Sequence, residues 1–190
     1  MRDVNAGFLQ GSILGPLLFL FYINDLSNGL KSNPKLFADD TSLFSVIHDV
    51  NSSQIDLNED LDKINNWAYQ WKMSFNPDPS KKAQEVVFSR KVINVLHPPL
   101  TFNNVDVGQI RSQKHLGMFL DFKLSFNEHL ETAFAKVNRG IAILRKLQSV
   151  LPREALLTIY KSFIRPHFDY GDVIYDQLYN DSFHAKLESF

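Results

Sequence analysis

The chain has 190 residues, enough for one domain with a core or one domain plus a small helical appendage, and this length excludes two large domains. A formal net charge of -1, from 20 Lys and Arg against 21 Asp and Glu, neither demands nor excludes a nucleic-acid partner. The lack of cysteine excludes a disulfide framework and a thiolate metal site, and the six scattered histidines show no metal-motif spacing.

A glycine-containing loop followed by an apolar run opens the chain. Ser12 is a suitable cap for a helix that tolerates Pro16 in its first turn and extends to about Ser27. The apolar run at 13–23 is shorter than the roughly 20 residues of a membrane span, and a signal peptide fits poorly. Because this helix has no polar face, we expect it to be buried nearly all round beneath a sheet.

Two adjacent carboxylates lie between two short runs of strand-forming residues. The pattern at 35–44 predicts a hairpin with Asp39 and Asp40 at its tip and a second strand that continues through Val46 and Ile47. Paired carboxylates are hard oxygen ligands, which suit Mg²⁺ in phosphoryl transfer. An ordinary solvated turn is the alternative, because Asp hydrogen-bonds its own backbone and tolerates turn geometry.

The clearest helical periodicity falls between residues 50 and 76. Its apolar stripe consists of Leu57, Leu61, Ile64, Ala68 and Trp71. Asp60 is assigned to the polar face, and Ser52 or Ser53 is expected to cap the first turn. The pattern is typical of an amphipathic helix that covers a core.

Short strands are predicted after a proline-containing break. Lys81 and Lys82 precede a strand expected at 85–89, and a solvated pair is the simpler interpretation of these cations by themselves. Residues 100–107 predict a hairpin. Residues 115–121 predict an apolar strand that ends in an acidic turn.

From Phe126 onward the spacing of apolar residues predicts helices. One apolar stripe ends before Pro152, a second helix is expected to reach Ile164, and residues 181–190 resemble the start of another. Between residues 136 and 165 there are seven Lys and Arg against a single Glu, so this part is basic. A basic helix face is often only solvated, and a grip on a phosphate backbone is the equal alternative.

Three segments carry a more specific signal: QGSILGPLLF (10–19), YINDL (22–26) and FADD (37–40). They are followed by Asn-Pro and Ser-Lys before a strand, by His-Leu-Gly and Leu-Asp, and then by the basic helices. In order and spacing, nearly the whole chain resembles the reverse transcriptase of non-LTR retrotransposons.

The resemblance implies an α+β fold. A partial polymerase palm, an antiparallel sheet with packed helices, would cover 1–125, and a helical thumb-like region, truncated at its C-terminus, would cover 126–190. The implied activity is that of an RNA-directed DNA polymerase, a nucleotidyltransferase with two Mg²⁺ ions as cofactor. Its implied partners are an RNA template, a DNA primer and deoxynucleoside triphosphates. We expect no membrane segment and an intracellular location, and the oligomeric state is not readable.

The resemblance also implies roles for individual residues. Asp39 and Asp40 match the palm aspartates that hold catalytic metal, and Lys81 matches the lysine near the leaving pyrophosphate. Gln10 and Gly11 match the loop that contacts template and incoming nucleotide. The primer grip is matched by His115, Leu116 and Gly117. The cations expected to hold the nucleic-acid backbone are Lys136, Arg139, Arg145 and Lys146.

The chain departs from the family pattern around its first motif. A third metal-binding aspartate belongs to a strand upstream of Gln10, and only nine residues precede Gln10, so we expect that aspartate and the fingers to be missing. Leu9 stands where the family has proline, and Lys82 adds a charge beside the matched lysine. With a metal ligand absent, we expect an incomplete two-metal site and no useful polymerase activity from the isolated chain.

Two other functions are open to this sequence. A non-enzymatic nucleic-acid-binding remnant would keep the basic helices without the chemistry. An unrelated Mg²⁺-dependent phosphohydrolase lacks support, because the sequence shows no further acidic cluster and no phosphate-cradling glycine loop of the P-loop type.

Overall fold

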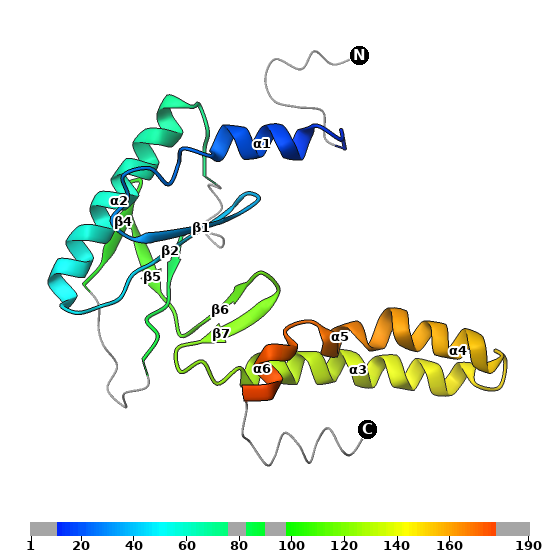
Figure 1. Ribbon diagram of the computed structural model, residues 1–190. Helices are drawn as coiled ribbons and strands as arrows, with labels where there is room; N and C mark the ends of the chain where they lie inside the picture. The colour runs from blue at the N-terminus through cyan, green and yellow to red at the C-terminus, as the bar shows by residue number, and fades with distance from the viewer. Residues whose placement is uncertain (1–10, 76–82, 90–97, 178–190) are drawn as a thin grey trace. The chain divides into compact units, whose positions relative to one another are not determined.

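A computed structural model describes residues 11–75, 83–89 and 98–177 (Figure 1). These residues form small sheets and helices, a mixed α/β structure, in two compact units. The hairpin unit comprises residues 1–85 and 95–109, and the helical unit comprises residues 86–94 and 110–190. The predicted boundary after residue 125 stays a prediction. In the structure, residues 110–125 group with the helices that follow them.

Helix α1 (Gly15–Ile23) begins near its predicted start, where the Ser12 hydroxyl accepts the Gly15 N–H at 3.0 Å. It ends four residues before the predicted end at Ser27. The expectation of burial all round is wrong, because only Ile23 is buried and Phe21 is 73% exposed. The exposed apolar side chains are Leu14, just before the helix, and Leu17, Leu18, Leu20 and Phe21 within it. The helix reaches the core with one side and its last turn, so its other faces meet solvent.

Strands β1 (Asn33–Phe37) and β2 (Asp40–Phe44) form the predicted antiparallel hairpin. The predicted continuation of the second strand through residues 46–47 is wrong. Asn33 is the first residue of β1 and pairs with Phe44, so β1 offers no partner to the residues that follow Phe44.

Helix α2 (Val50–Gln70) confirms the predicted periodicity, with Ile64 and Ala68 buried on its apolar side. The cap is Asp49 rather than Ser52 or Ser53: its carboxylate accepts the Ser52 N–H at 2.8 Å. This hydrogen bond holds the pKa of Asp49 below its ordinary value. Asp and Ser are about equally favourable as N-cap residues. The residue type alone therefore does not show whether Asp49, Ser52 or Ser53 caps this helix.

The core of the hairpin unit joins α1, α2 and the hairpin. Its buried residues are Ile23, Leu26 and Ile64, and the hairpin contributes Leu36 and Leu43. Asp60 is also buried, with no exposed surface, so its assignment to the solvated face is wrong. The turn before β1 packs on α2 at this point, and its N–H groups take the carboxylate as acceptor.

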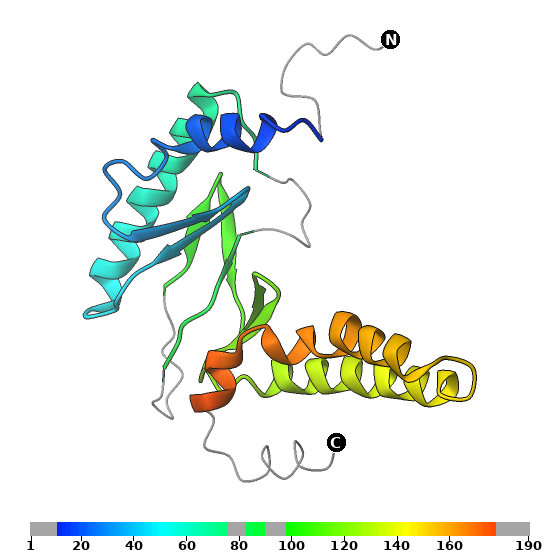
Figure 2. The same ribbon diagram turned by 45° about the vertical axis from the view of Figure 1, so that its right-hand side comes forward.

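A three-stranded sheet, in the order β3-β5-β4, lies beside α2 (Figure 2). Its strands are β3 (Gln84–Glu85), β4 (Leu100–Phe102) and β5 (Val105–Gln109). The predicted hairpin is confirmed, with Asn103 and Asn104 both in the left-handed region that a tight turn requires. The strand expected at 85–89 is shorter than predicted, because β5 ends at the partner of Glu85.

The helical unit begins with a second hairpin, β6 (Ser112–His115) and β7 (Met118–Asp121). The single strand predicted over 115–121 is therefore wrong, since the chain reverses at Leu116 and Gly117. The acidic turn after β7 is confirmed: Asp121 accepts the Phe126 N–H at 2.8 Å.

Helices complete this unit. They are α3 (Asn127–Leu147), α4 (Arg153–Ile159), the π-helical turn η2 (Tyr160–Ile164), α5 (Pro166–Asp169) and α6 (Asp172–Gln177). Both views show α3 and α4 side by side, and Val137 and Ile164 are buried between α3 and the helices after it. The helix expected at 181–190 lies outside the described residues. No described helix is long and apolar enough to cross a bilayer.

Candidate catalytic hairpin and nucleic-acid interface

The tip of the β1–β2 hairpin carries the predicted carboxylate pair. Phe37 pairs with Asp40, so the connecting turn consists of Ala38 and Asp39, and the second carboxylate opens β2. Both aspartates are exposed. The predicted placement of Asp39 and Asp40 at a hairpin tip is therefore confirmed.

The turn is held in an unusual conformation. Ala38 has a φ of 50°, in the left-handed region that costs a residue with a Cβ about 1–2 kcal/mol. Strain of this kind persists where the surrounding structure imposes it, and it is frequent at functional sites. The pairing of Phe37 with Asp40 therefore sets the backbone positions of both carboxylate residues.

The donor set of this tip suits a hard divalent cation in part. Two carboxylates supply oxygen ligands of the type that Mg²⁺ prefers. Across the described ranges, no group of three or more His, Asp or Glu residues is placed to hold a metal ion. Asp39 and Asp40 would therefore supply two carboxylate ligands of a metal site.

The other residues of the predicted catalytic centre are described only in part. Gly11 is exposed in a turn before α1 with a φ of 89°, a conformation that favours glycine. Gln10 and Lys81 lie outside the described residues, as do Leu9 and Lys82.

The predicted primer-grip residues form a tight turn in the helical unit. His115 ends β6, and Leu116 and Gly117 have φ values of 46° and 87°. The Tyr170 hydroxyl, from the corner after α5, donates a hydrogen bond to the Leu116 carbonyl. Sequence reasoning did not single out Tyr170, because a contact across 54 residues leaves no local pattern.

A hollow of about 240 Å³ adjoins this turn. Its lining includes Gly117, Lys136 and Tyr170, together with two histidines that the sequence left as scattered, His129 and His167. The structure thus brings a predicted grip residue and a predicted backbone-binding cation to one place. Burial, and then the charge of Lys136, lower the pKa of His129. The burial of the imidazole and the charge of Lys136 thus both disfavour a protonated His129 in this hollow.

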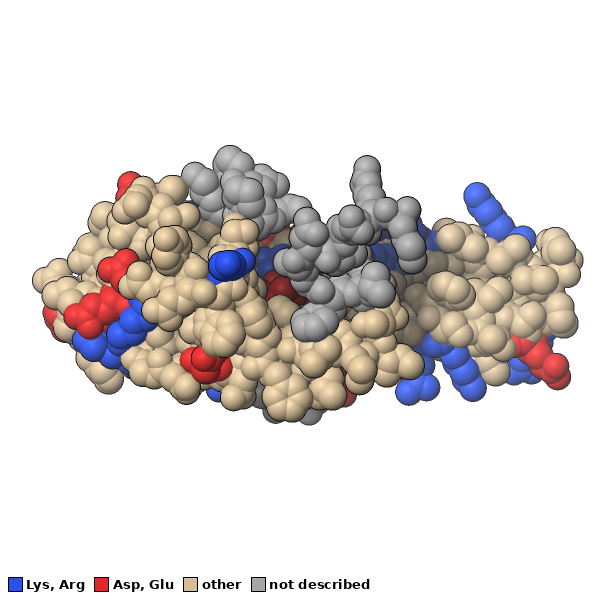
Figure 3. All heavy atoms as spheres, turned by 90° about the horizontal axis from the view of Figure 1, so that it is seen from above, with Lys and Arg blue, Asp and Glu red and all other residues tan. Residues whose placement is uncertain are grey.

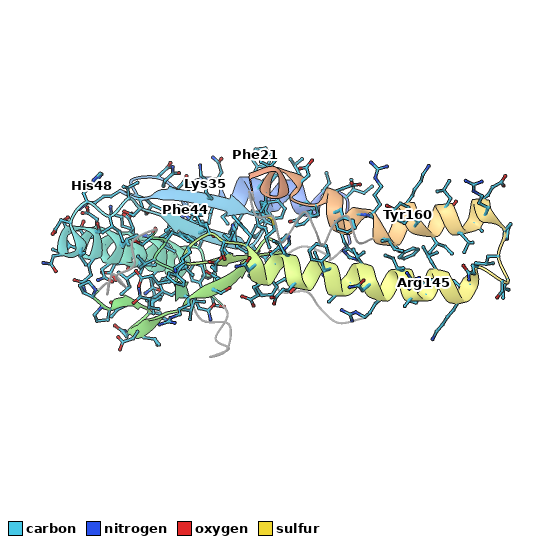
Figure 4. All side chains as sticks on the ribbon, turned by 90° about the horizontal axis from the view of Figure 1, so that it is seen from below. Phe21, Lys35, Phe44, His48, Arg145 and Tyr160 are labelled. Atoms are coloured by element: carbon cyan, nitrogen blue, oxygen red, sulfur yellow. The ribbon has the colours of Figure 1, made fainter. Side chains whose placement is uncertain are left out.

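The four cations predicted to hold nucleic acid are exposed on α3 but do not share one face. At 3.6 residues per turn, Lys136, Arg139 and Lys146 fall within an arc of about 80°, and Arg145 falls on the opposite flank. Lys and Arg project from both sides of the helical unit in Figure 3, and Figure 4 marks Arg145 on α3. The structure therefore brings three of the four together.

The described residues thus present two carboxylates at a hairpin tip, a glycine turn and an exposed helix that carries cations. Sequence comparison gives the family. The profile of the family described as "Reverse transcriptase (RNA-dependent DNA polymerase)" matches residues 2–118, more than half of the chain. The chain therefore belongs to the reverse transcriptase family, and the resemblance predicted from its motifs is confirmed.

Two similar curated proteins come from mobile elements of Drosophila melanogaster. The chain is 30% identical over 178 residues to "Probable RNA-directed DNA polymerase from transposon X-element", covering 90% of the chain and 19% of the relative. It is 26% identical over 188 residues to "RNA-directed DNA polymerase from mobile element jockey", covering 92% of the chain and 20% of the relative. The chain thus spans about a fifth of the length of these relatives. No solved structure matches it significantly.

Proposed function

We propose that this chain is the palm and thumb part of a retrotransposon RNA-directed DNA polymerase, with Asp39 and Asp40 as its metal-binding carboxylates. The observation that carries the proposal is the pairing of Phe37 with Asp40, which puts both carboxylates at a hairpin tip inside the matched region. Asp39 and Asp40 would hold Mg²⁺, and the chemistry supplied by the bound metal would be activation of the attacking hydroxyl and stabilisation of the leaving oxygens in nucleotidyl transfer.

The residues of the chain would share the remaining tasks. Lys81 would neutralise charge on the leaving pyrophosphate, and Gln10 and Gly11 would contact template and incoming nucleotide. The turn at 115–117 would hold the primer. Because base pairing with the template supplies sequence specificity, the cations of α3 need only contact the phosphate backbone.

On its own the chain is proposed not to extend a primer. One hairpin tip supplies two carboxylates, and the family's third metal ligand comes from an upstream strand. Loss of a few kcal/mol of transition-state stabilisation lowers a rate by orders of magnitude. A longer polypeptide, of which this chain would be one segment, would complete the site.

Primer extension tests the catalytic part. The purified chain is incubated with an RNA template, a DNA primer, Mg²⁺ and deoxynucleotides, beside the Asp39→Asn, Asp40→Asn variant and an Asp62→Asn control on the exposed side of α2. We expect no extension from any of them. Extension that disappears only in the double variant would overturn the proposed inactivity and would require a third ligand from within the chain.

Metal binding tests the carboxylate assignment without activity. Mn²⁺, used as a paramagnetic probe in place of Mg²⁺, should broaden the amide signals of residues 38–41 in the wild-type chain and in the Asp62→Asn control. The double variant should lose this broadening. Equal broadening in all three proteins would remove Asp39 and Asp40 from the metal site.

A non-enzymatic nucleic-acid-binding remnant is the second candidate, favoured by the exposed side of α3 that carries Lys136, Arg139 and Lys146. For it, duplex affinity should fall with salt and survive the loss of Asp39 and Asp40. Arg139→Gln with Lys146→Gln should lower the slope of log affinity against log salt by about 2. The charge-matched control, Lys72→Gln with Lys123→Gln, should leave the slope unchanged.

A further inference from the structure

We propose that Tyr170 is a positioning residue for the turn at Leu116 and Gly117, an inference that rests on the proposed function of this turn as a primer grip. The helical unit, through this one side chain, would set the direction of the backbone that meets the primer. Tyr170 would act through the turn, without contacting the reacting atoms.

The turn needs support from outside its own strands. Leu116 has a φ of 46°, and a left-handed conformation at a residue with a Cβ costs about 1–2 kcal/mol. The two-residue turn is closed by the pair His115 and Met118 at the end of a four-residue ladder. Such strain persists where neighbouring structure over-determines the conformation.

The Tyr170 side chain supplies that support in two ways. Its hydroxyl donates to the Leu116 carbonyl, which fixes the plane of the peptide between Leu116 and Gly117. Its ring also lies against Gly117, where an added Cβ would be 3.4 Å from both Cε1 and the hydroxyl oxygen. Glycine is therefore required at 117 by its φ of 87° and favoured by the neighbouring ring.

Gly171, the residue after Tyr170, lies against Met118, the first residue after the turn. Gly171 has a φ of 79°, and an added Cβ there would lie 3.0 Å from the Met118 sulfur. This corner is itself anchored, because the Tyr170 N–H donates to the Pro166 carbonyl at 3.1 Å and the Ile174 N–H donates to the Gly171 carbonyl at 2.9 Å. The turn is thus held by a corner that α5 and α6 hold from both ends.

Tyr170 lies at a hollow that is lined both by the turn and by α3, the helix that carries the cations. Tyr170, Gly117 and Lys136 line the same hollow. A primer held at the turn would therefore lie beside the hollow that Lys136 also lines. Removing the hydroxyl should loosen the turn while leaving the cations of α3 in place.

Hydrogen exchange in the free chain tests the positioning itself. Tyr170→Phe removes the hydroxyl and keeps the ring, and Tyr160→Phe makes the same change elsewhere in the helical unit. Loss of one hydrogen bond should accelerate amide exchange at residues 116–118 roughly five- to tenfold. The Tyr160→Phe control should leave these rates unchanged. Equal rates in Tyr170→Phe and wild type would overturn the inference.

A primer carrying a photoreactive 3′-terminal thymine, annealed to an RNA template, tests the functional consequence. We expect it to cross-link to the peptide 112–121, and Tyr170→Phe to lower the yield several-fold with duplex affinity changed less than twofold. A wild-type chain that binds no duplex, or cross-links elsewhere, would overturn the proposed grip and this role with it. A cross-link that Tyr170→Phe leaves intact would overturn the role of Tyr170 alone.

A second variant covers the case in which Tyr170→Phe does not fold. Gly171→Ala keeps the hydroxyl but brings a Cβ against Met118, so it should displace the same corner and lower the same cross-link. Urea unfolding of each variant identifies a folded preparation. Unchanged cross-linking in folded Gly171→Ala would contradict the proposal.

Discussion

The buried carboxylate of Asp60 accepts the backbone N–H of Ser32 at 2.7 Å. It also accepts the N–H of Lys31 at 2.9 Å, so one side chain of α2 holds the turn that leads into β1. Burial raises the pKa of Asp60, but these hydrogen bonds and the charge of Lys63 outweigh it, and the pKa lies below its ordinary value. The hairpin that carries the candidate carboxylates is thereby fixed to α2 through the start of its first strand.

Asp60→Asn should destabilise the hairpin unit by about 1–3 kcal/mol, because an amide cannot accept from both N–H groups with the strength of a carboxylate. Urea unfolding measures the change, and Asp62→Asn, on the exposed side of α2, is the matched control. A variant as stable as the control would show that water replaces the carboxylate at this turn.

The same carboxylate predicts an acid-dependent stability. Because the folded-state pKa of Asp60 is lowered, its contribution is present above the unfolded value of 3.8 and is lost as the pH falls through the folded-state pKa. Wild type should therefore lose more stability than Asp60→Asn between pH 5 and about pH 2. Parallel pH profiles of unfolding free energy for the two proteins would contradict this expectation.

Gly140→Ala should destabilise the helical unit. In an open helix this change would stabilise by about 1 kcal/mol, but here the new Cβ would lie 2.7 Å from Cγ1 of Ile164. Ile164 is fully buried, so the overpacking should cost about 1–3 kcal/mol. Thermal unfolding checks the sign against Gly108→Ala, where nothing lies within 4 Å. A double variant with Ile164→Ala should show strong non-additivity.

His129 should make the helical unit sensitive to mild acid. Burial lowers its folded-state pKa below the ordinary 6.5, so the unfolded chain takes up the proton first. The contribution of neutral His129 to the free energy of unfolding is then fully present above about pH 6.5, and it falls as the pH drops toward the folded-state pKa. His129→Gln should reduce this loss between pH 7 and 5, measured by urea unfolding. The exposed-site control His48→Gln should keep the wild-type profile.

The apolar outer side of α1 should tolerate truncation. Leu17→Ala and Phe21→Ala should each change stability by less than about 0.5 kcal/mol, because both side chains are exposed. Ile23→Ala, at the buried end of the same helix, should cost about 2–5 kcal/mol. The outer variants should also bind less of a hydrophobic dye and self-associate less. A large loss from Phe21→Ala would show that this side is covered.

The parts of the structure that follow from local signals were predictable. The Asn103–Asn104 hairpin and the hairpin tip at Asp39 and Asp40 depend on turn residues and their flanking strands. The turn at Leu116 was missed because a leucine does not signal a left-handed conformation.

Features that depend on distant partners were not predictable in the same way. The spacing of Asp60 along α2 is that of a solvated residue. Asp60 is buried because the turn at Lys31 and Ser32, nearly 30 residues earlier, packs against it. The sequence shows that α1 is apolar on all sides, but it does not show which of these sides packs against another element. Tyr170 has a role only because the fold brings it to Leu116.

The π-helical turn η2 inserts one residue into the helical path between α4 and α5, with the Arg165 N–H donating to the Tyr160 carbonyl at 3.0 Å. Each residue of a helix rotates the chain by about 100°. A deletion of one residue inside η2 would be absorbed, because the π turn would become an α turn. An insertion after η2 would instead rotate every later residue by about 100° and carry the Tyr170 hydroxyl away from Leu116. The chain can therefore lose one residue within Tyr160–Ile164, whereas a single-residue insertion between Arg165 and Tyr170 should uncouple these helices from the β6–β7 turn.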